Sequence, residues 1–349
     1  MKSVLRQATA REIKRWDELL TENPAGGEVF QTKAFAAVKK RQGWQPEFWV
    51  YETSFGQVYT LALTRKITGI GRIVYLPRGP GVVNVKQWRE ICRLNRKFEK
   101  TAILIKMNPP IIHNDIKTLP NDLTKVSNIQ RSTINTVVIN LDQPEEDLWR
   151  SFRQRARRSI RGGKKERLRV IDVEPSPASI AQMWQLYKNT AKRAKLSIRR
   201  QDYYQRFWQE FAERSIGRFF FVLPPNGQEP MAGAFISWSG KNALYKDGGS
   251  RRDGKTHFSH LLHWQIMCTL RERGITNYDL GGTPPSDRLN DPTHALASLV
   301  TFKLSFGAPV VDFIGTYDQV LKPTKYGRWQ QTERLWRGVV RHTPSRDIY

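Results

Sequence analysis

The segment FFFVLPPNGQEPMAGAFISWSGKNALYKDGGS, residues 219–250, decides the fold class of this chain. Its β-branched and aromatic residues alternate between the turn signals Asn226-Gly227 and Ser239-Gly240, which predicts a strand–turn–strand–turn–strand unit. A second segment, FWVYETSFGQVYTLALTRKITGIGRIVYLPRGPG at residues 48–81, follows the same plan. The chain therefore carries two strand-rich units of similar design, and this weak internal repeat favours duplication.

Helical patterns surround both segments. Amphipathic stretches over 11–42 and 178–214 precede them, and a helix over 257–274 follows the second. A strand over 276–281, a helix over 296–307 and a strand over 309–315 complete the pattern. We therefore predict an α/β protein of two units, with a junction near 142–150.

The composition is that of an ordinary globular protein. With 349 residues, the chain is long enough for two domains that each bury a core. Its two cysteines make no disulfide framework, which favours a reducing cytoplasm. The sequence has no apolar run long enough to span a membrane and no signal-peptide pattern, so we expect a soluble protein.

The positive charge of the chain indicates polyanionic partners. The formal net charge is +26 and the pI is near 10.3, a balance that attracts nucleic acid, anionic membranes or phosphorylated substrates. Residues 150–170 hold ten Lys and Arg against one acid, Glu166. Because acids four residues away do not balance these cations, polyanion contact is favoured over a solvated surface helix.

The segment GSRRDGKT, residues 249–256, matches the phosphate-binding loop consensus between an apparent strand and a helix. Too little chain follows it for the βα units that a nucleotide-hydrolysing domain needs, so we disfavour that interpretation. Arg251, Arg252 and Lys255 beside a helix N-terminus still suit a phosphate group.

No metal site or nucleophile is evident. His257, His260 and His263 spread over about 120° of helix surface and about 9 Å of helix length, too far apart for one ion. The sequence shows no catalytic triad and no pair of carboxylates. A basic site of this kind suits transfer of an activated acyl group to an amine, in which the enzyme positions two substrates and stabilises an oxyanion.

The segment LASLVTFKLSFG, residues 296–307, places Lys303 in the middle of an apolar helix face, with Gly307 at the C-cap. The apolar members of that face are Leu296, Leu299, Val300, Phe302 and Phe306. Two interpretations stay open for Lys303. Its ammonium stabilises an oxyanion, or its stem lies in the stripe and the ammonium reaches water at the helix end.

Several motifs occur in the order seen in the Fem family (FemABX-like) of peptidoglycan peptidyltransferases, and the resemblance covers about residues 29–318. The motifs are VFQTKAFAAVKKRQGW (29–44), YLPRGPG (75–81), LWRSFRQRARRSIRGGKK (148–165), YDLGGT (278–283) and FKLSFG (302–307).

The resemblance implies two tandem GNAT-like (acyl-CoA N-acyltransferase-like) domains with mixed sheets flanked by helices, without a coiled-coil arm. We expect the first domain at 1–145 and the second at 146–317. A helix over 318–340 is expected to pack back on the first domain.

Fem-like enzymes take an amino acid from an aminoacyl-tRNA and attach it to the stem peptide of a peptidoglycan precursor, which is UDP-linked or lipid-linked. The resemblance thus implies a cytoplasmic monomer with aminoacyl-tRNA as co-substrate and no other cofactor. The tail after residue 318 suggests peripheral contact with the anionic inner face of the membrane.

The resemblance also implies roles for individual residues. Lys303, preceded by Phe302, corresponds to the lysine that stabilises the tetrahedral intermediate. Lys39 and Arg200, with Tyr204, correspond to the groups that hold the precursor's diphosphate. The expected substrate-pocket tyrosine is Tyr245, and the alternative to Arg200 is its neighbour Arg199.

The expected tRNA contacts are Arg155, Arg157, Arg158, Arg251, Arg252 and Lys255. Asn108 stands where the family often has Asp, so we assign it no acid–base role. Two other functions stay open: a coenzyme-A-dependent GNAT N-acyltransferase, because RRDGK resembles a pyrophosphate loop, and a non-catalytic protein that binds RNA or membrane.

Overall fold

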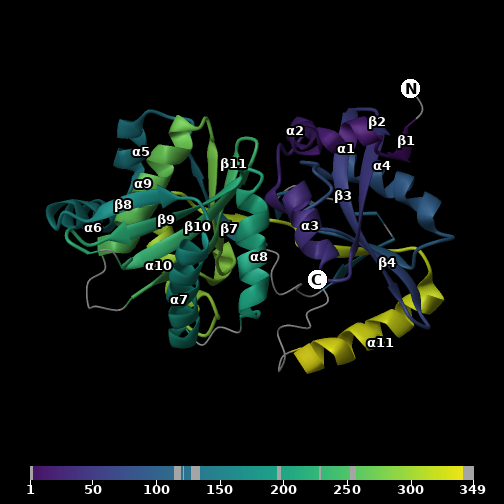
Figure 1. Ribbon diagram of the computed structural model, residues 1–349. Helices are drawn as coiled ribbons and strands as arrows, with labels where there is room; N and C mark the ends of the chain where they lie inside the picture. The colour runs from purple at the N-terminus through teal and green to yellow at the C-terminus, as the bar shows by residue number, and fades with distance from the viewer. Residues whose placement is uncertain are drawn as a thin grey trace. The chain divides into compact units, whose positions relative to one another are not determined.

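The computed structural model describes residues 3–113, 119–120, 122–126, 134–194, 198–227, 229–251 and 257–340. The chain divides into two compact units (Figure 1). Unit 1 comprises Met1–Ile134 and Asp312–Tyr349, and unit 2 comprises Asn135–Val311. The prediction of an α/β protein with two mixed sheets is confirmed.

Unit 1 is built on a mixed sheet with the strand order β1-β2-β3-β4-β5-β14-β6. Its strands are β1 (Val4–Gln7), β2 (Gln45–Thr53), β3 (Gly56–Ile67), β4 (Gly71–Leu76), β5 (Leu104–Met107), β6 (Leu123–Val126) and β14 (Thr316–Val320). Strands β4 and β5 pair in parallel and the other neighbours are antiparallel. The predicted turn at Phe55-Gly56 joins β2 to β3.

Helices cover both faces of this sheet. They are α1 (Ala10–Lys14), α2 (Trp16–Leu19), α3 (Lys33–Lys40), α4 (Val85–Asn95) and α11 (Pro323–Val340). On one face, α4 buries Trp88 and Ile91 in a core that includes Trp49 and Met107 of the sheet. The helix α11 (yellow in Figure 1) belongs to unit 1, as expected, and its Tyr326 hydroxyl donates to Asp318 of β14 at 3.0 Å.

Unit 2 also has a mixed sheet, with the strand order β13-β7-β12-β11-β10-β9-β8. Its strands are β7 (Asn135–Asn140), β8 (Arg169–Val173), β9 (Gly217–Leu223), β10 (Ala232–Ser239), β11 (Asn242–Ser250), β12 (Asn277–Gly282) and β13 (Val310–Asp312). The predicted unit at 219–250 forms β9, β10 and β11, with turns where the sequence placed them. Strands β11 and β12 pair in parallel.

The helices of unit 2 lie on the two faces of its sheet. They are α5 (Glu145–Ser151), α6 (Gln154–Lys165), α7 (Pro177–Arg193), α8 (Gln201–Ala212), α9 (His257–Glu272) and α10 (Ala297–Leu304). Phe220 and Val222 of β9 join the core beneath α5, α6 and α9. Phe219 points to the other face, where its ring contacts Trp208 of α8. Successive side chains of β9 therefore point to opposite faces of the sheet, and helices cover both faces.

The unit boundaries differ from the predicted ones at 145/146 and 317/318. Strand β7 pairs with β12 and so belongs to unit 2, whereas β14 pairs with β5 and β6 and so belongs to unit 1. The linker-like residues 141–144 connect β7 to α5 inside unit 2. The single strand predicted at 309–315 is replaced by β13 and β14, and the terminal helix begins at Pro323 rather than at residue 318.

Two glycines with positive φ allow a test of how closely α10 packs. Gly307 has φ +87°, and a Cβ there would lie 2.1 Å from the Ser151 carbonyl oxygen. Gly274 has φ +73° with no atom within 4 Å of its Cβ position. We expect Gly307→Ala to lower the free energy of unfolding by about 3 kcal/mol or more, because it adds a backbone clash to the conformational cost.

The matched variant Gly274→Ala should lose only about 1 kcal/mol, the cost of a left-handed alanine alone. Chemical denaturation of both variants and the wild type provides the comparison. Equal losses for the two variants would contradict the close approach of α10 to the end of α5.

Candidate active site around Lys303

The helix α10 places a lysine on its buried face. Lys303 is 4% exposed and lies with Val300 and Phe306, which are 9% and 1% exposed. The prediction that Leu299 lies on the buried apolar face is wrong, because this residue is 38% exposed. The helix ends at Leu304 with Ser305 as its C-cap, two residues before the predicted Gly307, which has the left-handed conformation that follows many helix ends.

The Lys303 ammonium does not reach bulk water. Its Nζ donates a hydrogen bond to the carbonyl oxygen of Gly282 at 2.7 Å. The side chain therefore turns back over β12, and the alternative in which the ammonium extends to water at the helix end is excluded. An ammonium has three N–H donors, and the Gly282 carbonyl accepts one of them.

A polar turn after β12 positions the Gly282 carbonyl. The Asp279 carboxylate accepts the backbone N–H of Gly281 at 2.7 Å. The Thr136 hydroxyl of β7 lies within hydrogen-bond distance of both the Asp279 carboxylate and the Gly281 carbonyl. Gly281 has φ +75°, a conformation that other residues rarely adopt. These contacts fix the backbone on which the Lys303 ammonium rests.

The site lies where two parallel strands stop pairing. Strands β11 and β12 are in register only over Asn242–Leu244 and Asn277–Asp279, although both continue further. Beyond that point, the Cβ position of Gly281 lies 3.4 Å from the Tyr245 carbonyl oxygen and 3.7 Å from Lys303 Nζ. Beyond the last paired residues, the backbone groups of β11 and β12 no longer bond to each other, and they lie close to the ammonium.

Burial sets the charge state of Lys303. It lowers the pKa of the ammonium from 10.5 to about 8, and the negative charge of Asp279 opposes this shift. At neutral pH the group is still mostly protonated. Lys303 is therefore a positive hydrogen-bond donor with little water around it, where its electrostatic effect is strongest.

Aromatic rings form a wall beside the lysine. Phe302 lies 4.9 Å from the His260 ring and 5.3 Å from the His263 ring, measured between centroids. Tyr245 contacts His263 edge-on at 4.6 Å. The predicted substrate residues Phe302 and Tyr245 therefore lie in one cluster around the two histidines.

The two histidines hold this wall in place. The His260 Nε2 lies 3.0 Å from the Ser305 hydroxyl at the end of α10, and the His263 Nδ1 lies 2.8 Å from the Tyr278 hydroxyl. Burial, with the positive charges of His260 and Lys303, lowers the pKa of His263 to about 3. His263 is thus neutral at physiological pH. In the part of the chain that the structure describes, no three His, Cys, Asp or Glu side chains are placed to hold a metal ion.

The Tyr245 hydroxyl remains a proton donor. Burial and the charge of Asp247 raise the pKa of Tyr245 above its ordinary value. Its ring lies against Gly248 of β11, since a Cβ there would lie 1.8 Å from the Tyr245 hydroxyl oxygen. Glycine at this position therefore lets the phenol occupy its present place.

The other predicted substrate residues of unit 2 lie at the start of α8. Tyr204 is 3% exposed, and its hydroxyl lies 3.3 Å from both the Tyr187 hydroxyl and the Arg199 backbone nitrogen. Arg199 is buried with its guanidinium 4.6 Å from the Tyr203 ring. The Arg200 side chain is 76% exposed. Of the two neighbouring arginines, Arg200 is therefore the accessible one.

Lys39 lies in unit 1, on α3. It is 3% exposed, and its Nζ donates to the Gln42 side chain at 3.0 Å and lies 5.3 Å from the Phe35 ring centroid. A diphosphate role for this lysine stays a prediction.

The basic segment forms α6, which begins against the end of α10. The Arg153 backbone N–H donates to the Ser305 carbonyl at 2.9 Å. Ala156 and Ile160 face the core, whereas Arg155 and Arg158 are exposed and Arg157 is half-buried. The described residues provide no acidic partner for these three arginines. The basic helix is thus anchored to the helix that carries Lys303.

The remaining predicted phosphate contacts lie beyond β11. Arg251 is exposed and pairs with Glu229 at 2.5 Å. Arg252 and Lys255 lie outside the described residues.

Sequence reasoning missed the residues that support Lys303. Thr136 and Asp279 are separated by 143 positions and approach only because β7 and β12 pair. The spacing of His263 speaks only against a metal site, and it does not predict that this histidine is buried and contacts Tyr278 and Tyr245. The glycine pair in YDLGGT was the available signal, because paired glycines after a strand indicate close backbone approach.

Titration of Lys303 provides a test of its burial. Because its folded-state pKa of about 8 lies below the unfolded value of 10.5, the unfolded chain binds more protons between these values. Wild-type stability relative to Lys303→Met should therefore rise with pH, by about 2 kcal/mol between about pH 7 and about pH 9.5. Denaturant unfolding of both proteins across this range measures the difference, and a constant difference would show that Lys303 is solvated.

Comparison with known proteins supports this description. Residues 150–288, within unit 2, match the family described as "Acetyltransferase (GNAT) domain". The chain is 27% identical over 167 residues to the lipid II:glycine glycyltransferase of Staphylococcus saprophyticus, covering 45% of this chain and 39% of that protein. The Staphylococcus epidermidis enzyme is 32% identical over 97 residues, which cover 28% of this chain and 23% of the enzyme. The chain thus spans about two fifths or less of these relatives.

Solved structures agree on the fold. The crystal structure of FemX superimposes with a TM-score of 0.75 over 94% of this chain and 99% of that one, at 17% identity. Among the helices described here, none is both long and apolar enough to cross a bilayer. The chain therefore shares the fold of FemX, carries a GNAT-type domain in its second unit and is similar over part of its length to the lipid II:glycine glycyltransferases.

Proposed function

We propose that the protein is an aminoacyltransferase that moves an amino acid from an aminoacyl-tRNA to the stem peptide of a peptidoglycan precursor. The observation that carries the proposal is the buried Lys303 ammonium beside the diverging strands β11 and β12. The similarity of the chain to lipid II:glycine glycyltransferases also supports the proposal.

The reaction needs little chemistry from the protein. The side-chain amine of the precursor attacks the ester carbonyl carbon, a C–N bond forms, and the C–O bond to the tRNA ribose breaks. The amine loses a proton and the ribose oxygen gains one, so that no oxidant or cofactor is required. Because the ester is already activated, catalysis consists of positioning and of stabilising the oxyanion.

Lys303 supplies the oxyanion donor in this mechanism. One of its N–H groups is held by the Gly282 carbonyl, which fixes the direction of the other two. Phe302, Tyr245 and the two buried histidines keep water away from the ammonium, which strengthens its interaction with a developing negative charge.

The phosphate-rich substrates account for the basic surface. The exposed arginines of α6 are the proposed contacts of tRNA, and Lys39, Arg200 and Tyr204 are the proposed contacts of the precursor. Arg251, Arg252 and Lys255 extend the proposed tRNA surface. These assignments, contact with an anionic membrane and a monomeric state are parts of the proposal.

A coenzyme-A-dependent N-acyltransferase is the second candidate. The match of residues 150–288 to a GNAT domain favours it. The two proposals differ in the ligand that stabilises the protein against heat. Deacylated tRNA should raise the melting temperature if the first is correct, whereas coenzyme A should do so if the second is correct.

Replacing Lys303 tests the proposed mechanism. The protein is incubated with charged total tRNA and with a UDP-linked or a lipid-linked muropeptide, and mass spectrometry detects the added residue. We expect Lys303→Met to bind both substrates but to lose about 10²-fold or more in turnover, the usual cost of removing an oxyanion donor.

The matched control is Lys241→Met, which removes an exposed lysine of unit 2. Its turnover should equal that of the wild type. Near-wild-type turnover by Lys303→Met would overturn the catalytic role. Tight RNA binding with no transfer to either muropeptide would favour a non-catalytic RNA-binding protein.

Removing the arginines of α6 tests the tRNA surface. We expect the variant Arg155→Ala, Arg157→Ala, Arg158→Ala to bind tRNA more weakly. The slope of log affinity against log salt should become shallower by about 2 to 3, because each lost phosphate contact removes about one counterion release. Filter binding at several salt concentrations measures both quantities.

A charge-matched control lies on the other face of the sheet. The variant Lys188→Ala, Lys192→Ala, Arg206→Ala removes three exposed cations from α7 and α8. Its salt slope should change little. An equal change in the two triple variants would indicate that only the overall charge matters, and no change in either would overturn the assignment to α6.

A further inference from the structure

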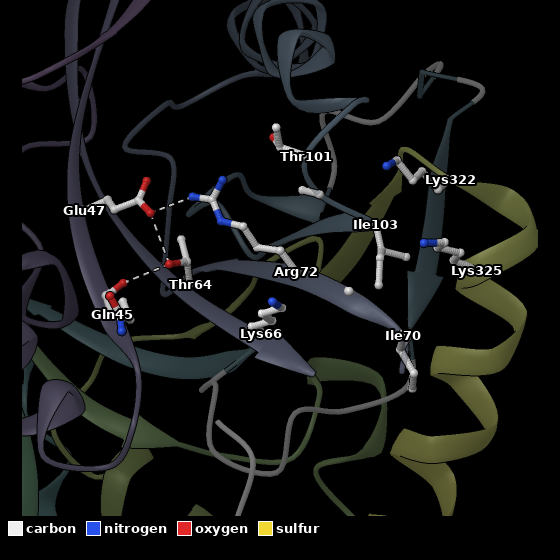
Figure 2. Close-up of a pocket in the computed structure, with 12 residues that line it drawn as sticks. Gln45, Glu47, Thr64, Lys66, Ile70, Arg72, Thr101, Ile103, Lys322 and Lys325 are labelled. Atoms are coloured by element: carbon white, nitrogen blue, oxygen red, sulfur yellow. Dashed lines mark hydrogen bonds and ion pairs between the residues drawn. The ribbon is translucent and has the colours of Figure 1, made fainter. Parts of the chain in front are cut away.

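Unit 1 holds a hollow of about 460 Å³ that none of the proposed roles uses (Figure 2). It lies between the end of β3, the start of β4, the residues just before β5 and the first turn of α11. Its lining includes Lys66, Arg72, Lys322 and Lys325. Four cations thus surround one hollow, and the only carboxylate among the lining residues is Glu47.

The carboxylate in the hollow is already neutralised. Glu47 pairs with the Arg72 guanidinium at 2.6 Å and accepts a hydrogen bond from the Thr64 hydroxyl at 3.1 Å. These contacts lie at one end of the hollow, as Figure 2 shows. The three lysines are therefore an uncompensated positive charge along the rest of it.

The lysines are available to a ligand. Figure 2 shows the Lys322 and Lys325 ammonium groups on the side of α11 and Lys66 on the side of β3. Lys322 Nζ donates to the Lys100 carbonyl at 2.7 Å, which leaves two of its N–H groups. Lys66 and Lys325 are exposed, and the described residues give their side chains no hydrogen bond or ion pair.

The N-terminus of α11 adds to the positive potential. The N–H of Tyr326 makes the first helical bond, to the Lys322 carbonyl at 2.9 Å. The N–H groups of Thr324 and Lys325, in the turn before it, have no helical acceptor. An 18-residue helix begins there, so its dipole favours an anion at this end of the hollow.

The shape of the hollow disfavours a membrane. It is concave, and its apolar floor is formed by Ile103, which is 1% exposed, and by half-buried Ile70. No exposed apolar side chain among its lining residues reaches outward to insert into lipid. A flat bilayer surface would thus meet only the rim lysines and not the groups inside.

We propose that this hollow binds the sugar–phosphate backbone of RNA, as a second tRNA contact that lies on unit 1. The proposal rests on the proposed function, which makes tRNA a substrate. Lysines from two separate segments, the end of β3 and the start of α11, line an open hollow, an arrangement that suits successive phosphates along a strand rather than one small anion. Contacts of these cations with phosphate groups would position RNA without selecting sequence.

The test compares two double variants of the full chain. Lys66→Ala with Lys325→Ala removes two lysines of the hollow. Lys14→Ala with Lys86→Ala removes two exposed lysines of α1 and α4 and serves as the charge-matched control. Deacylated tRNA is the probe, and its affinity is measured over a series of salt concentrations, together with the melting temperature of each variant to exclude unfolding.

We expect the first variant to bind tRNA about tenfold more weakly, with a salt slope shallower by about 2, and the control to match the wild type. Equal behaviour of both variants, while the wild type binds tRNA, would overturn this inference and leave the proposed function standing. Absence of tRNA binding by the wild type would overturn both.

Two further probes test whether the hollow binds a small anion or an anionic membrane instead of RNA. Inorganic diphosphate is tested by thermal shift, and vesicles with anionic lipid are tested by sedimentation. If the substitutions in the hollow abolish the effect of either probe but leave tRNA affinity unchanged, the hollow serves a small anion or a membrane, and the RNA assignment is wrong.

Discussion

The hydrogen bond from the Lys303 ammonium to the Gly282 carbonyl is the constraint on which the candidate site depends. Its 2.7 Å length ties α10 to the end of β12 and keeps a 4%-exposed cation out of water. A carbonyl oxygen carries only a partial charge, so it satisfies one donor without neutralising the ammonium. A direct carboxylate partner would have held the charge more firmly and left less of it for an oxyanion.

The surrounding backbone accommodates this cation through glycines. Gly281 adopts φ +75° between the Tyr245 carbonyl and the ammonium, and Gly307 lets α10 end against the Ser151 carbonyl. The Asp279 carboxylate and the Thr136 hydroxyl then complete the hydrogen bonding of the turn at the end of β12. The site therefore depends on the divergence of β11 and β12. Gly282 of β12 lies beyond the last residue that pairs with β11, and its carbonyl binds Lys303 instead.

Local signals in the sequence predicted what local interactions determine. The turn at Ser239-Gly240, the end of α10 before Gly307 and the anomaly of Lys303 on an apolar face each depend on a few neighbouring residues. Strand β7 belongs to unit 2 and β14 to unit 1, contrary to the prediction, because of pairings between strands that are distant in the sequence. The contact of Thr136 with Asp279 depends on the same kind of pairing. No periodicity in a single sequence records such pairings, because alternation shows that a strand is buried but not which strand lies beside it.

The distribution of cations separates structural from functional charge. Lys106 is buried 2.7 Å from Asp318 within unit 1, and the half-buried Lys246 lies 3.1 Å from Asp247 within unit 2, so these pairs add no net charge. The net charge of +26 therefore comes from other residues, among them the exposed cations of α6 and of the hollow in unit 1. Like charges at an exposed surface repel one another and cost stability. The described residues give Arg155, Arg158, Lys66 and Lys325 no carboxylate partner, and a bound polyanion would offset the repulsion among such cations.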